Sequence, residues 1–145
     1  RSCGKIQYTT GGIALLFHGF KTQDERRNYG GSAFIEIQFC DMPLQTSIKE
    51  RASNAHIRHW NDRSLYIHID DSDVFYRAYH RIFDCGTYNN LKTGPMDLYG
   101  INYYAPTLTD PIIERLSKEK PKDYEVLTAW LIRAKAHNGF YILGL

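Results

Sequence analysis

Residues 32–39 have the sequence SAFIEIQF, and their side chains alternate in character along the chain. One face of an extended chain would carry Ala33, Ile35, Ile37 and Phe39, and the opposite face Phe34, Glu36 and Gln38. Successive side chains of a strand point to opposite faces, so this alternation predicts a half-buried strand. We expect the row that contains Glu36 to face solvent.

Further strands are indicated on both sides of this stretch. Residues 65–69 repeat the alternation, with Leu65, Ile67 and Ile69 facing inward and Tyr66 and His68 facing outward. Residues 13–17 predict a short buried strand, and residues 98–104 a strand interrupted by Gly100. Residues 140–145 are almost wholly apolar, which favours a central strand, because such a strand is covered on both faces.

An acidic run follows the strand predicted at residues 65–69. Its members, Asp70, Asp71, Ser72 and Asp73, suit the N-cap and first turn of a helix that we expect to run to about Phe83. The same carboxylates could instead bind a divalent ion or meet a basic partner.

Other helices are indicated by their start and stop signals. Residues 43–54 predict a short helix, and Asp110-Pro111 opens another. A third begins near Pro121 and ends at Asn138-Gly139. Residues 21–31 and 85–95 are interpreted as loops.

The order of these elements decides the fold class. Strands and helices do not alternate regularly, which argues against a doubly wound parallel sheet. We expect one α+β domain over residues 1–145, with a mostly antiparallel sheet and helices packed on one face. Residues 1–4 are interpreted as a trimmed or tagged start and carry no weight in this prediction.

Composition narrows the class of protein. The chain has 145 residues, of which 43% are hydrophobic and 23% charged, and this globular balance excludes a disordered chain. The net charge of +2 argues against nucleic-acid binding by bulk electrostatics. Cys3, Cys40 and Cys85 form no CxxC pair, so we expect reduced thiols and a cytoplasmic location. No apolar run approaches the roughly 18 residues of a membrane helix.

Histidines and basic residues cluster between residues 49 and 63. His56 and His59 are three residues apart and could share a metal on a helix, but no HExxH pattern is present, and we expect no metal. A second hypothesis is single-stranded nucleic-acid binding by basic residues around an aromatic ring: Lys49, Arg51, Arg58, Arg63 and Trp60. Glu50 and Asp62 dilute this patch, and a solvated basic segment with Trp60 turned inward explains it equally.

The outward row of the two alternating strands is a further candidate site. If these strands are neighbours, Glu36 and His68 could meet and support acid–base chemistry. The usual explanation of such a row is the wet side of an antiparallel sheet. A binding surface is the third interpretation, because aromatic anchors such as Tyr66, Tyr99 and Tyr103 suit interfaces.

The C-terminal third resembles a known family in four consecutive features. These are Tyr99–Tyr104 (YGINYY), the capped helix from Asp110, Leu127–Leu131 (LTAWL) and Asn138–Gly144 (NGFYILG). The pattern resembles small bacterial immunity proteins that neutralise toxins of contact-dependent growth inhibition and related polymorphic systems. In those proteins a helix with a tryptophan-leucine core often leads through an asparagine-glycine turn into a terminal strand.

The resemblance implies a non-catalytic protein that binds a cognate toxin domain, covers its active site and needs no cofactor. Inhibitors of basic nuclease toxins are often acidic, so the positive net charge of this chain either argues against a nuclease target or requires a local acidic patch such as residues 70–73. We expect the contacts to be Asp70, Asp71, Asp73, Tyr66, His68 and Glu36. The alternatives are a small nuclease or hydrolase that uses His56, His59, His68 or His80, and a nucleic-acid-binding module.

Overall fold

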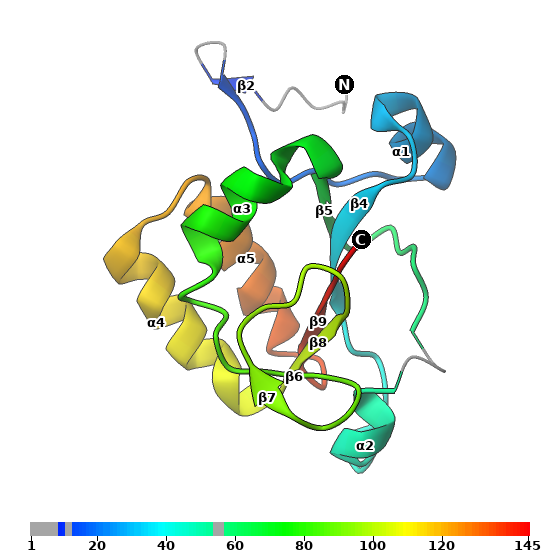
Figure 1. Ribbon diagram of the computed structural model, residues 1–145, viewed down its shortest axis with the longest axis vertical. Coiled ribbons are helices and arrows are strands. Elements are labelled where there is room, and N and C mark those ends of the chain that lie inside the picture. The colour runs from blue at the N-terminus through cyan, green and yellow to red at the C-terminus, as the bar shows by residue number, and fades with distance from the viewer. Residues whose placement is uncertain (1–8, 11–12, 54–56) are drawn as a thin grey trace.

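The computed structural model describes residues 9–10, 13–53 and 57–145, and its main feature is one antiparallel sheet (Figure 1). The order of its six strands is β5-β4-β9-β8-β6-β7. Their bounds are Phe34–Phe39 (β4), Leu65–His68 (β5), Gly86–Thr87 (β6), Thr93–Gly94 (β7), Ile101–Tyr104 (β8) and Phe140–Leu143 (β9). A separate two-stranded ribbon pairs Thr9–Thr10 (β2) with Ile13–Ala14 (β3). The antiparallel α+β prediction is therefore confirmed.

The C-terminal strand is central, as its apolar sequence predicts. β9 pairs with β4 on one side, where Tyr141 lies opposite Gln38, and with β8 on the other, where Tyr141 lies opposite Tyr103. The turn before β9 requires Gly139, whose φ is +87°, and a Cβ there would lie 2.3 Å from the carbonyl oxygen of Tyr104.

Three helices cover one face of the sheet: Ser72–Tyr79 (α3), Thr109–Glu119 (α4) and Tyr124–Ala134 (α5) (Figure 1). Their apolar side chains enclose the main core with Ile35, Ile37 and Phe39 of β4. Trp130 of α5 stacks on Phe39 with ring centroids 4.1 Å apart. Its indole Nε1–H donates to the carbonyl of Arg63 over 2.8 Å, which ties α5 to the segment before β5.

The second face of the sheet is also covered, which corrects the prediction of a solvent-facing row. All six residues of β4 are buried, including Glu36 at 3% exposure and Gln38 at 7%. Ala52, which caps the short helix Ile48–Arg51 (α2), packs in a small cluster with Tyr103 and Tyr141. Residues 57–63 and the helix Gln23–Gly30 (α1) cover the rest of this face, as the contacts below show.

Several element boundaries also differ from the sequence prediction. Residues 23–30 form α1 where we expected a loop; the Thr22 hydroxyl caps it by accepting from the amide of Glu25. The predicted loop at 85–95 contains the β6-β7 hairpin. The acidic run forms the 3₁₀ turn Ile69–Asp71 (η2), and α3 ends at Tyr79. A second 3₁₀ turn, Pro106–Leu108 (η3), precedes α4.

Within the described residues, no helix has the length and apolar character needed to cross a bilayer.

Candidate functional site

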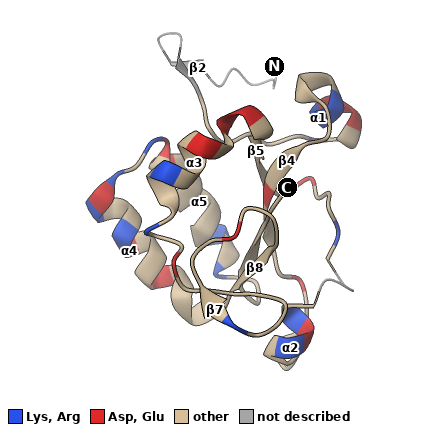
Figure 2. Ribbon diagram, viewed as in Figure 1, with Lys and Arg blue, Asp and Glu red and all other residues tan. Residues whose placement is uncertain are grey.

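The acidic run lies at the surface, where β5 leads into α3 (Figure 2). Asp71 occupies the N-cap position of α3, yet its side chain makes no capping hydrogen bond. The carboxylates of Asp70, Asp71 and Asp73 accept no hydrogen bond from the described residues. Helix capping therefore does not occupy these groups, although their charge still suits the start of a helix.

These three carboxylates also lack lysine and arginine partners in the part of the chain that the structure describes. No described Lys or Arg lies within 4.0 Å of any of them. The nearest cationic candidate is His68, whose Nδ1 is 3.5 Å from the carboxylate of Asp70. The run is thus an uncompensated negative patch on a chain whose overall charge is slightly positive.

His68 holds this patch in a fixed position. Its Nδ1 accepts from the amide of Asp70 over 3.1 Å, so the ring proton belongs on Nε2, which donates to the carbonyl of Gly30 over 2.8 Å. The ring lies so close to Gly30 that an added Cβ would be 2.5 Å from its Cδ2 and Nε2. One imidazole therefore joins the end of α1 to the start of η2.

Exposed apolar side chains border the patch. Tyr29 of α1 is 51% exposed and Ile69 of η2 is 40% exposed. The Tyr29 hydroxyl is 3.1 Å from Nε2 of His18, and its ring contacts His68. Burial raises the pKa of Tyr29 above its ordinary value, and the charge of Asp71 raises it further. We define the acidic face as Tyr29, Ile69, Asp70, Asp71 and Asp73.

The sequence analysis missed Tyr29 because residues 21–31 were interpreted as a loop. The capping pattern at Thr22, with Asp24 and Glu25 in the first turn, is the signal that could have located this helix.

Glu36 and Tyr66, two other expected contacts, are enclosed on the second face of the sheet. The strands are neighbours, but Glu36 lies opposite Tyr66, while His68 lies opposite Phe34. The carboxylate and the imidazole therefore do not form the acid–base pair considered from the sequence. Tyr66 is fully buried, so a docking partner could reach it only if the covering segments moved.

The carboxylate of Glu36 is held by a buried polar cluster. Its Oε2 accepts from Gln38 Nε2 at 2.9 Å and from the Ser64 hydroxyl at 2.7 Å. The Tyr66 hydroxyl is 3.1 Å away, although its single proton is shared with the carbonyl of Asn61 at 2.9 Å. Loss of hydration on burial raises the pKa of Glu36, while these hydrogen bonds partly oppose the rise.

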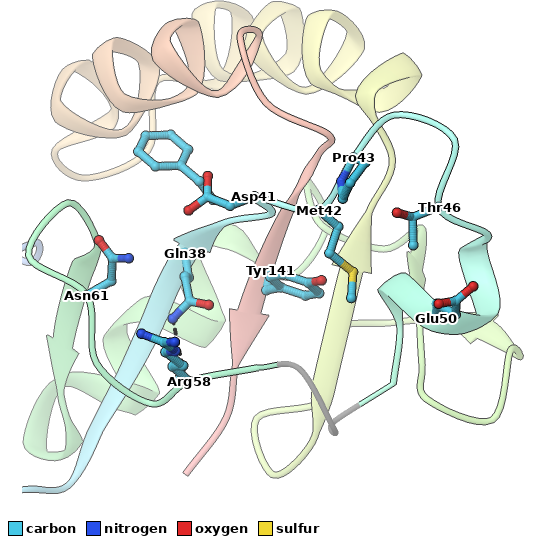
Figure 3. Close-up of a pocket in the computed structure, with 10 residues that line it drawn as sticks. Gln38, Asp41, Met42, Pro43, Thr46, Glu50, Arg58, Asn61 and Tyr141 are labelled. Carbon is cyan, nitrogen blue, oxygen red and sulfur yellow. Dashed lines mark hydrogen bonds between the residues drawn. The ribbon is translucent and has the colours of Figure 1, made fainter.

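A cavity of about 560 Å³ also lies on the second face of the sheet, between residues 41–50 and 58–61 (Figure 3). Tyr141, Gln38 and Arg58 line this cavity, and Gln38 Nε2 donates to the carbonyl of Arg58 (Figure 3). Asp41 on its rim is already paired with Arg63 at 2.5 Å and His137 at 2.8 Å. The cavity is thus lined by both acidic and basic side chains, and the Asp41 carboxylate is already paired with basic groups of the chain.

The basic segment considered for nucleic-acid binding is largely committed to internal contacts. Arg51 donates to the Tyr103 hydroxyl and to Asn138, and Trp60 stacks on Tyr66. Lys49 and Arg58 are exposed. Among the described residues of this segment, these contacts leave no continuous row of free cations with an open aromatic ring.

Of the remaining histidine and cysteine candidates, those that the structure describes form no cluster. His56 and Cys3 lie outside the described residues, and His80 Nδ1 is bonded to the carbonyl of Tyr76 over 2.9 Å. Cys40 is buried and accepts from the Tyr141 hydroxyl, whereas Cys85 is half-buried. In the described ranges, no group of three or more His, Cys, Asp or Glu side chains is placed to hold a metal.

No protein-family model, curated protein or solved structure matches the chain.

Proposed function

We propose that this chain is a cytoplasmic immunity protein that binds a cognate bacterial toxin domain and neutralises it by covering its active site. The proposal is supported by the sequence resemblance and by one structural observation. That observation is the acidic face, whose three carboxylates have no lysine or arginine partner within the described residues.

The chemistry of this face favours a basic protein partner. Uncompensated carboxylates attract a surface of opposite charge and speed its association, while exposed apolar groups such as Tyr29 supply contact area. His68 fixes the two elements that carry the face, so little ordering would accompany binding. A standard interface of roughly 1,600 Å² would extend beyond these five residues onto α1 and α3.

The test uses the toxin domain encoded beside this chain's gene in its source genome, co-expressed with the chain in bacteria. The wild-type chain should be harmless alone and should restore growth. Asp70→Lys/Asp73→Lys should lose this protection. The control Glu114→Lys/Glu119→Lys makes the same charge change on α4, where neither carboxylate has an ion pair among the described residues, and should still protect.

Two results would contradict the proposal. One is killing of the host by the chain alone, abolished by changing a single histidine to Ala, which would favour the enzyme hypothesis. The other is full protection by the Asp70→Lys/Asp73→Lys variant, which would place the interface elsewhere.

A further inference from the structure

A small hollow lies on the second face of the sheet, beside the C-terminal end of β9. Its volume is about 300 Å³, at the low end of small-molecule sites, which span roughly 300–1,000 Å³. The wall is formed by nine residues: Arg26, Ser32, Ala33, Phe34, Glu36, His59, Leu143, Gly144 and Leu145. It thus combines one guanidinium and one carboxylate with an apolar surface.

The carboxylate in this wall is incompletely satisfied. Glu36 is 3% exposed, and its hydrogen bonds from Gln38, Ser64 and Tyr66 all go to Oε2. Its other oxygen, Oε1, accepts no hydrogen bond from the described residues. This oxygen is not fully buried, so it stays available to a donor group placed in the hollow, which would form a charge-assisted hydrogen bond with it.

The guanidinium in the wall is also incompletely satisfied. Arg26 is 9% exposed and packs against the rings of Phe34, Trp60 and Tyr66 at 5.3–5.8 Å. Its Nη1 donates to the carbonyl of His59 over 3.1 Å, whereas Nε has no partner within the described residues. Nη2 likewise donates to no described residue.

These two charges do not neutralise each other by direct contact. No nitrogen of Arg26 lies within 4.0 Å of the Glu36 carboxylate, although the charge of Arg26 favours the ionised form of Glu36. A simple cation in the hollow would be repelled by Arg26, and a simple anion by Glu36. A ligand that carries both charges would meet each with its opposite.

We propose that this hollow binds a small zwitterionic α-amino acid with an aliphatic side chain. Its ammonium group donates to Oε1 of Glu36, and its carboxylate accepts from the guanidinium of Arg26. The aliphatic side chain lies against Phe34 and Leu143. The volume of about 300 Å³ admits one amino acid. This site is distinct from the acidic face, so the proposal does not depend on the toxin-binding function.

The test is a ¹H–¹⁵N NMR titration of the whole chain with L-leucine. We expect saturable shifts at the backbone amides of Phe34 and Gly144 and at Arg26 Nε. Two analogues each lack one charge: 4-methylpentanoate has no ammonium group and 3-methylbutylamine has no carboxylate. Each should bind at least about 10-fold more weakly, which is the loss of one charged hydrogen bond.

Two variants separate ligand recognition from folding. Glu36→Gln removes the charge that the ammonium meets and should weaken L-leucine about 10-fold while 4-methylpentanoate binds no worse. Ser32→Phe adds a ring at an exposed wall residue that has the strand alternation of Phe34 and Glu36, and it should abolish the shifts. Its control, Ala136→Phe, places the same side chain at another exposed position and should bind as the wild type does.

The proposal is overturned if L-leucine gives no saturable shift up to about 10 mM. It is also overturned if the two single-charge analogues bind as well as L-leucine, or if Ser32→Phe binds like Ala136→Phe. None of these outcomes bears on protection against a toxin, which the charge reversals at Asp70 and Asp73 test separately.

Discussion

Replacing Gly30 by Ala tests whether His68 joins α1 to the acidic face. In an ordinary helix this change would stabilise the protein by roughly 0.5–1 kcal/mol, because glycine has the larger entropy to lose on folding. Here the added Cβ would lie 2.5 Å from two atoms of the His68 ring, which is held on both sides by hydrogen bonds. Overpacking of this kind costs about 1–3 kcal/mol, so we expect a net loss of about 1–2 kcal/mol.

The variant His68→Ala removes the obstacle and changes the sign of the effect. Alone it should destabilise the protein by about 2 kcal/mol, since two hydrogen bonds are lost. In that background, however, Gly30→Ala should be neutral or stabilising, because its Cβ meets no ring. Gly30→Ala should therefore cost about 2 kcal/mol less in the His68→Ala background than in the wild type, and this difference is the coupling energy between the two positions.

Urea unfolding followed by tryptophan fluorescence gives the four free energies of this cycle. The reasoning is refuted if Gly30→Ala costs the same in both backgrounds. That result would mean that the His68 ring does not lie against Gly30 and that His68 does not link α1 to η2.

Three further changes test the core and the buried carboxylate by the same unfolding measurement. Gly139→Ala should cost about 2 kcal/mol or more, because its positive φ and its 2.3 Å approach to the Tyr104 carbonyl both exclude a side chain; an unchanged urea midpoint would contradict the turn. Trp130→Phe should cost about 1–3 kcal/mol by leaving the Arg63 carbonyl without its donor, and a smaller loss would show that solvent replaces it. Burial raises the pKa of Glu36 in the folded protein. The free energy of unfolding of the wild type, compared with that of Glu36→Gln, should therefore be highest at low pH and should fall as the pH rises from about 4.5 through the raised pKa. A difference in unfolding free energy that does not change with pH would count against burial of the charge.

The sequence was sufficient to predict four of the six strands of the sheet, β4, β5, β8 and β9, but not the β6-β7 hairpin. The alternation at residues 32–39 and 65–69 predicted two strands that prove to be neighbours, and the apolar run at residues 140–145 predicted the central strand. These predictions succeed because side-chain periodicity and burial of one face follow directly from the geometry of a strand.

The covering of the second face could not be predicted in this way. α1 lacks an apolar stripe, and its inward side chain is Arg26, which is buried by packing on aromatic rings brought from β4, β5 and residue 60. Residues 57–63 close the face through single contacts, such as the Gln38 amide to the Arg58 carbonyl. Such contacts depend on tertiary placement and leave no periodic signal, so Glu36 looked exposed in the sequence and is enclosed in the fold.

The candidate site was predicted only in part. The acidic side chains are exposed or half-buried, as expected for Asp70, Asp71 and Asp73. The sequence favoured helix capping by these side chains, but in the structure they make no capping hydrogen bond. Tyr29 joins them because α1 packs against His68, a contact between residues 38 positions apart that no local pattern reveals.

The central claim is that this molecule acts by binding a basic protein through its acidic face. Isothermal titration of the purified chain into the toxin domain encoded beside it measures this directly. We predict a one-to-one complex whose dissociation constant rises at least about 100-fold for Asp70→Lys/Asp73→Lys and is unchanged for Glu114→Lys/Glu119→Lys. No heat of binding for the wild-type chain, or equal affinities for the two reversed variants, would contradict the claim.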